Sequence, residues 1–207
     1  MLSRNMTLIF QAGVLLVTFS GCKSTSTDSS FFGGGTQKSA ADFKQANSVD
    51  NLKALFEELN KARLGNETSK AAALTRGLLP DEGRIRKALR DDAQPDSVKQ
   101  IVTLLQGLTP TDEKSLARVF AADPANTEVQ VHGATTEEIS SYEKGSAAFN
   151  EFPGGAQRLA SEILRPNMTF YEVELLKPGN DAGMKFHLFF WDGTQWTMLG
   201  PIWRASR

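Results

Sequence analysis

The stretch TFYEVELLKPGNDAGMKFHLFFWDGTQWTMLGPIWR, residues 169–204, decides the fold and contains all three tryptophans of the chain. In its first part, Tyr171, Val173 and Leu175 alternate with Glu172 and Glu174. A period of two residues is typical of a β-strand with one apolar face and one exposed face. We therefore predict a half-exposed strand over residues 170–176, with its two glutamates on the exposed face.

Two more strands follow in the same stretch. Residues 184–191 are largely apolar on both alternating faces, which predicts a central strand covered on both sides, by the chain or by a partner. The pair Asp192-Gly193 indicates a β-hairpin, because the turn requires residues that tolerate positive φ. Pro201 has no N–H to donate, so the end of the third strand should lie at a sheet edge or beyond the paired residues.

From Val49 to Ala122 the apolar residues instead recur with a helical period. This region predicts a small array of five short, closely joined helices. The first helix should start where Asp50 can cap it and end at Gly65, and the second should cover residues 69–78. The third should start at Pro80. The fourth should run from Pro95 or Asp96 to Gly107, and the fifth from Thr109-Pro110 to Asp123-Pro124.

Residues 126–207 mix both kinds of element. A strand over residues 127–131 should end at His132-Gly133, and a capping box at Thr135 and Glu138 indicates a helix from Thr136. After an irregular segment over residues 149–155, a further helix should stop at Arg165-Pro166. We predict an α+β chain: a helical subdomain over residues 48–125, then an α+β subdomain over residues 126–207. Its four-stranded, mainly antiparallel sheet has helices on one face and ends in a β-meander.

Charge and cysteine content exclude several classes of protein. The formal net charge of the 207 residues is −1, which gives no electrostatic support for nucleic-acid binding. The single cysteine, Cys22, excludes an intramolecular disulfide and a zinc site built from cysteines. Hydrophobic residues make up 40% of the chain, enough for an ordinary globular core.

The N-terminus points to the cell envelope. Arg4 precedes an apolar run from Leu8 to Phe19, which is too short for a comfortable membrane span of about 20 residues and is typical of a secretory signal. The residues Phe19-Ser20-Gly21-Cys22 resemble the lipobox of bacterial lipoproteins. This resemblance covers residues 1–22 and implies removal of residues 1–21 and acylation of Cys22, for example by palmitate.

Two further expectations follow for this terminus. Residues 22–47, rich in Ser, Thr and Gly, should form a flexible tether between the lipid anchor and the domain. Lys23 follows Cys22 where Asp would favour inner-membrane retention. By resemblance to enterobacterial sorting rules, we expect the periplasmic face of the outer membrane.

Catalytic, cofactor and metal motifs are not recognisable in the sequence, which contains no GxSxG, HExxH, P-loop or GxGxxG pattern. We therefore assign no catalytic residue, cofactor or metal ligand. His132 and His187, with Glu137 or Glu138 nearby, would bind a metal only if they converge, and two independent histidines are favoured. The basic residues Arg84, Arg86, Lys87 and Arg90 suggest an anion-binding patch or a solvated helix face, and the solvated face is favoured.

The C-terminal sheet is the candidate binding surface. Its members are Trp191, Trp196, Trp203, Phe189 and His187, which could contact an envelope protein or a glycan. The aromatic residues could equally be ordinary core residues of the sheet, and that interpretation is favoured. The leading hypothesis is a non-enzymatic, membrane-anchored lipoprotein with a binding or structural role. The alternative is a small-molecule carrier or enzyme with His187, Glu172 and a tryptophan-lined cavity in one site. In element order the chain resembles cone-shaped cystatin-like and nuclear-transport-factor-like folds, an analogy of architecture alone.

Overall fold

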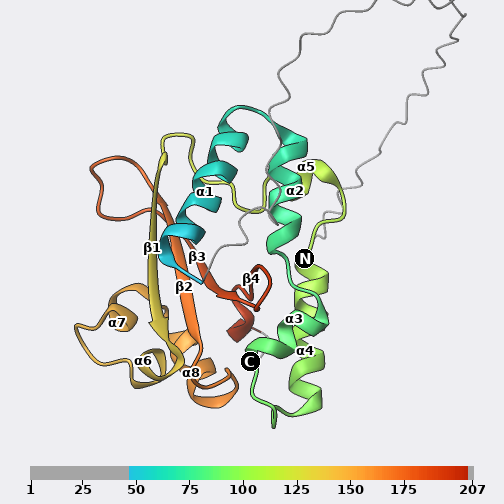
Figure 1. The fold of residues 1–207 in the computed structure, drawn as a ribbon, viewed down its shortest axis with the longest axis vertical. Coiled ribbons are helices and arrows are strands. Elements are labelled where there is room, and N and C mark those ends of the chain that lie inside the picture. The colour runs from blue at the N-terminus through green and yellow to red at the C-terminus, as the bar shows by residue number, and fades with distance from the viewer. Residues whose placement is uncertain (1–46, 205–207) are drawn as a thin grey trace, which may run out of the picture. The chain divides into compact units, whose positions relative to one another are not determined.

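The computed structural model describes residues 47–204, so the predictions for residues 1–46, including Cys22, lie outside it. The element order confirms the predicted α+β class (Figure 1). Five helices come first: α1 (Val49–Leu64), α2 (Thr68–Leu78), α3 (Glu82–Ala88), α4 (Pro95–Leu108) and α5 (Glu113–Leu116). After them come β1 (Glu128–Thr135), α6 (Thr136–Ser141), α7 (Ala147–Glu151), α8 (Gly154–Glu162), β2 (Thr169–Leu176), β3 (Met184–Trp191), β4 (Trp196–Met198) and the 3₁₀ helix η2 (Ile202–Arg204).

Local capping residues set the helix starts. The Ser48 side chain accepts a hydrogen bond from the Asn51 N–H at 3.2 Å, so Ser48, not Asp50, caps α1. Asp50 lies in the first turn, where its charge favours the positive end of the helix. The predicted fifth helix is much shorter than expected, because Asp112 caps it after Pro110 and it ends at Leu116.

The four strands form one antiparallel sheet in the order β1-β2-β3-β4. β4 is therefore an edge strand, as Pro201 predicted. β1 continues past its predicted end at His132-Gly133 and pairs with β2 as far as Thr135. Gly133 allows this because a Cβ there would lie only 2.9 Å from the Tyr171 ring.

Helices cover both faces of the sheet, which corrects the prediction of one covered face. One apolar cluster joins α1, α2 and Phe120 to one face of the sheet. A second cluster joins α3, α4, α6, α7, α8 and η2 to the other. Sheet residues of the first cluster are Val129, Tyr171, Val173, Leu175, Phe189 and Trp196, and those of the second are Ala134, Phe170, Leu188 and Phe190.

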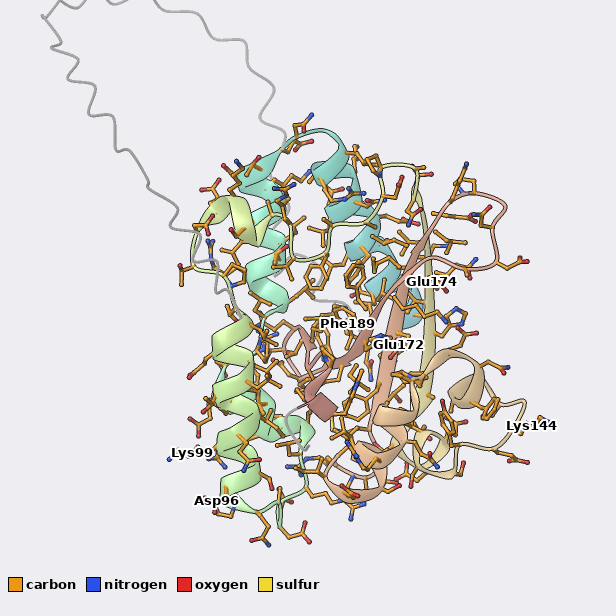
Figure 2. The ribbon with its side chains drawn as sticks, turned by 180° about the vertical axis from the view of Figure 1, so that it is seen from behind. Asp96, Lys99, Lys144, Glu172, Glu174 and Phe189 are labelled. Atoms are coloured by element: carbon orange, nitrogen blue, oxygen red, sulfur yellow. The ribbon has the colours of Figure 1, made fainter. Side chains whose placement is uncertain are left out.

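This double cover buries all of β2 except its first residue, Thr169. Every residue from Phe170 to Leu176 is buried, including Glu172 at 0% and Glu174 at 4% exposure. The prediction that these glutamates face solvent is therefore wrong. Both glutamates lie on one face of β2 (Figure 2), where Glu174 accepts a hydrogen bond from the Gly183 N–H and Glu172 contacts His187.

Three short helices connect β1 to β2. The capping box of Thr135 and Glu138 is present as predicted, and it starts α6 directly at the end of β1. The segment predicted to be irregular, residues 149–155, overlaps the end of α7, which Ser146 caps, and the start of α8 at Gly154. Within the described residues, none of the helices combines the length and apolar character needed to span a bilayer.

Candidate functional site

The five residues predicted as one binding surface lie on both faces of the sheet. Phe189 and Trp196 are buried under α1, at 0% and 2% exposure, and the Trp196 indole donates to Asn51 Oδ1 at 2.7 Å. Trp191 is half-buried and packs edge-on against Trp196. His187 and Trp203 lie together on the opposite face. Burial of Phe189 and Trp196 means that the five do not form one exposed aromatic surface.

A β-bulge places His187 beside Glu172. Tyr171 pairs with Phe189 and Val173 with Phe186, so His187 and Leu188 together oppose Glu172. Leu188 adopts a positive φ of 58°, which is strained for a branched apolar residue. The bulge turns His187 towards the same face as Glu172, and His187 Nδ1 contacts Glu172 Oε2.

Trp203 covers this pair from the C-terminal end. Its ring centroid lies 5.4 Å from that of His187, in an edge-to-face arrangement. The indole also lies against Gly155 in α8, where a Cβ would come within 2.5 Å of Trp203 Cγ. The absence of a side chain at Gly155 therefore gives Trp203 its position over His187.

Burial dominates the electrostatics of Glu172. It raises the pKa of Glu172 to about 7, although the contact with His187 acts in the opposite direction. Glu172 Oε1 is buried and has no hydrogen-bond partner among the described residues. The His187 side chain is 25% exposed, so a buried carboxylate holds Nδ1 while the ring reaches the surface. A histidine oriented in this way can exchange a proton or a hydrogen bond with a bound molecule.

Four more polar side chains, from His132, Glu151, Glu174 and Lys185, extend this polar face. The Lys185 ammonium lies 2.7 Å from Glu151 Oε2 and 3.7 Å from Glu174 Oε2, and His132 Nε2 lies 3.7 Å from Glu151 Oε2. Burial lowers the pKa of Lys185, but the hydrogen bond that Lys185 donates to Glu151 and the charges of the three glutamates outweigh burial and raise the pKa. The alternation pattern of β2 could have indicated that Glu174 lies on the same face as Glu172. Glu151 comes from another element, and only the tertiary structure places it beside Glu174.

The two histidines flank β2 on this face, because His132 pairs with Glu172 across β1 and β2. Their predicted acidic neighbours are engaged elsewhere: Glu137 accepts from the Asn167 N–H, and Glu138 completes the capping box. The side chains whose ligand atoms converge are His132, Glu151 and Glu174, within 4.8 Å of one another. These three residues could hold a metal ion.

The basic residues around α3 divide between the surface and the core: Arg86 and Lys87 are exposed, as the favoured solvated face predicts, whereas Arg84 is buried. Arg84 is 8% exposed and bonds to Asp192 Oδ2 and to Thr197 Oγ1, each at 2.8 Å. Lys87 donates to the Asp192 carbonyl and Arg90 to the Leu164 carbonyl. Arg86 pairs with Glu82 on the surface. Arg84 is thus buried and not part of a solvated face, and all four side chains already have acceptors.

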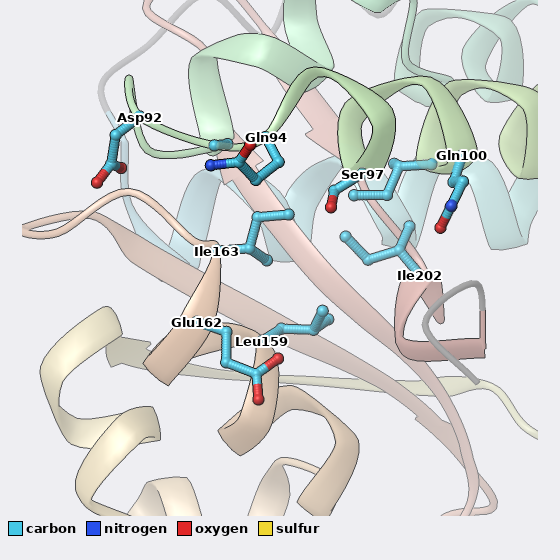
Figure 3. A pocket seen from close by; sticks show the side chains of 10 residues that line it. Asp92, Gln94, Ser97, Gln100, Leu159, Glu162, Ile163 and Ile202 are labelled. Carbon is cyan, nitrogen blue, oxygen red and sulfur yellow. The ribbon is translucent and has the colours of Figure 1, made fainter.

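A cleft lies on the same side of the sheet, between α4, α8 and η2 (Figure 3). Its volume is about 330 Å³, in the lower range for small-molecule pockets. Ser97 and Gln100 point from α4 towards Ile163 and Ile202 across the cleft (Figure 3). Its other lining residues are Asp92, Ala93, Gln94, Ile101, Leu159 and Glu162. Ile202 precedes Trp203 in η2, so the cleft and the His187 site share one short element.

Comparison with known proteins adds no relative. No protein-family model, no curated protein and no solved structure matches this chain. The fold and the polar face of the sheet are therefore the basis for a functional proposal.

Proposed function

We propose that this chain is a lipid-anchored protein of the bacterial cell envelope whose domain binds a small polar molecule beside His187 and Trp203. The observation that carries the proposal is the contact between His187 and fully buried Glu172 under the Trp203 ring. Cys22 and the tether supply the anchoring part, from the resemblance of residues 1–22 to lipoprotein signals. The expected location is the periplasmic face of the outer membrane.

The ligand class follows from the two exposed contact groups. His187 offers a ring nitrogen whose tautomer the Glu172 carboxylate fixes, which favours a hydrogen-bonding group on the ligand. Trp203 is half-buried and offers an aromatic surface for a flat or apolar portion. A buried carboxylate that is incompletely hydrogen-bonded costs stability, which is consistent with a functional role and not with packing alone.

Native mass spectrometry of the detergent-extracted protein from its own source tests this proposal, with an intact denatured mass alongside. We expect a chain that begins at acylated Cys22 and retains one small molecule. His187→Ala and Trp203→Ala should lose that molecule, whereas Trp191→Ala, on the opposite face, should retain it. An unmodified chain starting elsewhere would exclude the lipid anchor, and a bare domain or retention by all three variants would exclude the site.

An acid–base enzyme is the second candidate, because a carboxylate that orients histidine is also the arrangement of a general base. The chemical fate of the retained molecule distinguishes a carrier from an enzyme. After incubation with the protein, a carrier returns its ligand unchanged, whereas an enzyme returns a product. Glu172→Gln should then reduce turnover more than it reduces ligand retention.

A further inference from the structure

The polar face of the sheet carries more negative than positive charge. Three carboxylates, from Glu151, Glu172 and Glu174, surround one ammonium group, that of Lys185. Glu172 and Glu174 are buried at 0% and 4% exposure, so solvent screens their charges poorly. The cluster therefore holds more carboxylates than ammonium groups, and an additional cation would be stabilised there.

Three side chains are placed to coordinate such a cation. His132 comes from β1, Glu174 from β2 and Glu151 from the end of α7, and their ligand atoms lie within 4.8 Å of one another. His132 Nε2 and Glu151 Oε2 are already 3.7 Å apart. Two ligands of a tetrahedral zinc ion at ~2.1 Å bond lengths lie roughly 3.4 Å apart. His132 Nε2 and Glu151 Oε2 would therefore need to approach each other only slightly to bind one ion.

A second observation points to the same place. Glu172 Oε1 is fully buried and has no hydrogen-bond partner among the described residues. Glu172 lies on the same face of β2 as Glu174, and it pairs in register with His132. It also lies close enough to raise the pKa of Lys185 together with Glu151 and Glu174. A cation bound at the cluster would lie near this buried carboxylate and reduce the cost of burying its charge.

We propose that His132, Glu151 and Glu174 form a binding site for a divalent transition-metal ion such as Zn²⁺, which competes with the Lys185 ammonium. One imidazole nitrogen and two carboxylate oxygens are a mixed ligand set that suits such an ion and leaves a position open for water or a ligand. The Lys185 side chain is 28% exposed and can swing into solvent when the metal enters. Its three ligands differ from the residues of the small-molecule site at His187, although Glu172 lies between the two sites.

Zinc titration of the full-length chain in detergent tests the site, with Cys22→Ser removing the only thiol. Isothermal calorimetry at pH 7.5 should show one Zn²⁺ per chain, with no comparable signal from Mg²⁺. His132→Ala should weaken the Kd at least tenfold, and Lys185→Met should tighten it at least tenfold. Glu162→Gln, an exposed carboxylate at the end of α8 and outside the cluster, should leave the Kd unchanged.

Mn²⁺ provides a readout that does not depend on affinity differences. In NMR spectra, the paramagnetic ion should broaden the amide signals around residues 132, 151 and 174 first. If Lys185→Met does not fold, Lys185→Gln replaces it as the variant without the ammonium group. Saturable binding that His132→Ala leaves intact would overturn the proposal. Absence of binding in both the unmodified chain and the Lys185 variant would also overturn it. Binding in the Lys185 variant alone would overturn it too, because Lys185 would then be the permanent counter-ion of these carboxylates.

Discussion

At the residue scale, Arg84 shows how a charged side chain becomes a structural one. Its guanidinium is buried and donates to Asp192, Thr197 and main-chain carbonyls of Leu79 and Gly77. Burial lowers the pKa of Arg84, and the Asp192 charge opposes that shift. Such a pair is costly to break, because the remaining partner is left charged and buried.

We expect Arg84→Met to lower the free energy of unfolding by about 3–5 kcal/mol. Arg86→Met, two residues along the same helix, removes an exposed pair with Glu82 and should cost less than about 1 kcal/mol. Urea unfolding followed by tryptophan fluorescence measures both values. Similar losses in the two variants would contradict the structural role of Arg84.

Asp192 makes this network sensitive to acid. Burial raises its pKa, but hydrogen bonds from Thr194 and Gln195 and the charge of Arg84 outweigh burial and hold the pKa at about 2. An unfolded Asp binds a proton more readily, so the stabilisation is complete above about pH 4 and is lost as pH falls towards 2. We expect a loss of roughly 2 kcal/mol from this group in that range. Urea unfolding at several pH values measures the free energy of unfolding as a function of pH. Thr194→Val should reduce the slope of this curve between about pH 4 and 2, and an unchanged slope would show that Asp192 is not the group responsible.

At the element scale, the sequence predicts what each strand is more reliably than what covers it. Period-two alternation correctly identified β2 and showed that Glu172 and Glu174 share a face. Alternation carries no information about α7 and η2, which come from distant residues and bury that face. For the same reason His187 and Glu172 could be suggested as one site, whereas the contribution of Glu151 could not. The bulge at Leu188 has no local signal, since glycine is the usual residue at positive φ.

The packing of η2 on α8 depends on one glycine, and this gives an element-scale prediction. In Gly155→Ala the new Cβ would overlap the Trp203 indole and displace it from His187. In Gly154→Ala, one residue earlier, the new Cβ meets nothing within 4 Å. We expect a shifted tryptophan emission and a stability loss of about 1–3 kcal/mol for Gly155→Ala only. Equal spectra and equal unfolding midpoints in the two variants would exclude this contact.

At the scale of the whole molecule, the central strands connect two apolar clusters. Phe170 belongs to the cluster under α8, whereas Tyr171 and Val173 belong to the cluster under α1. Phe56 in α1 packs edge-on against Phe189 of β3 at 5.1 Å, so the helices before residue 126 complete the core of the sheet after it. Loss of either cluster exposes one face of β2, and neither face is stable in water without its helices.

This sharing predicts one cooperative unfolding transition for residues 47–204. Phe56→Ala and Phe170→Ala each remove a fully buried ring, so each should cost about 3–5 kcal/mol. Hydrogen exchange followed by mass spectrometry should show the slowest amides of α1 and α8 accelerating together, roughly a hundredfold or more, in both variants. Phe149→Ala, at 39% exposure, is the matched control and should change neither helix strongly. If Phe56→Ala accelerated exchange in α1 alone, the two faces would be separate folding units, and the sheet would owe its stability to α6–α8 without α1 and α2.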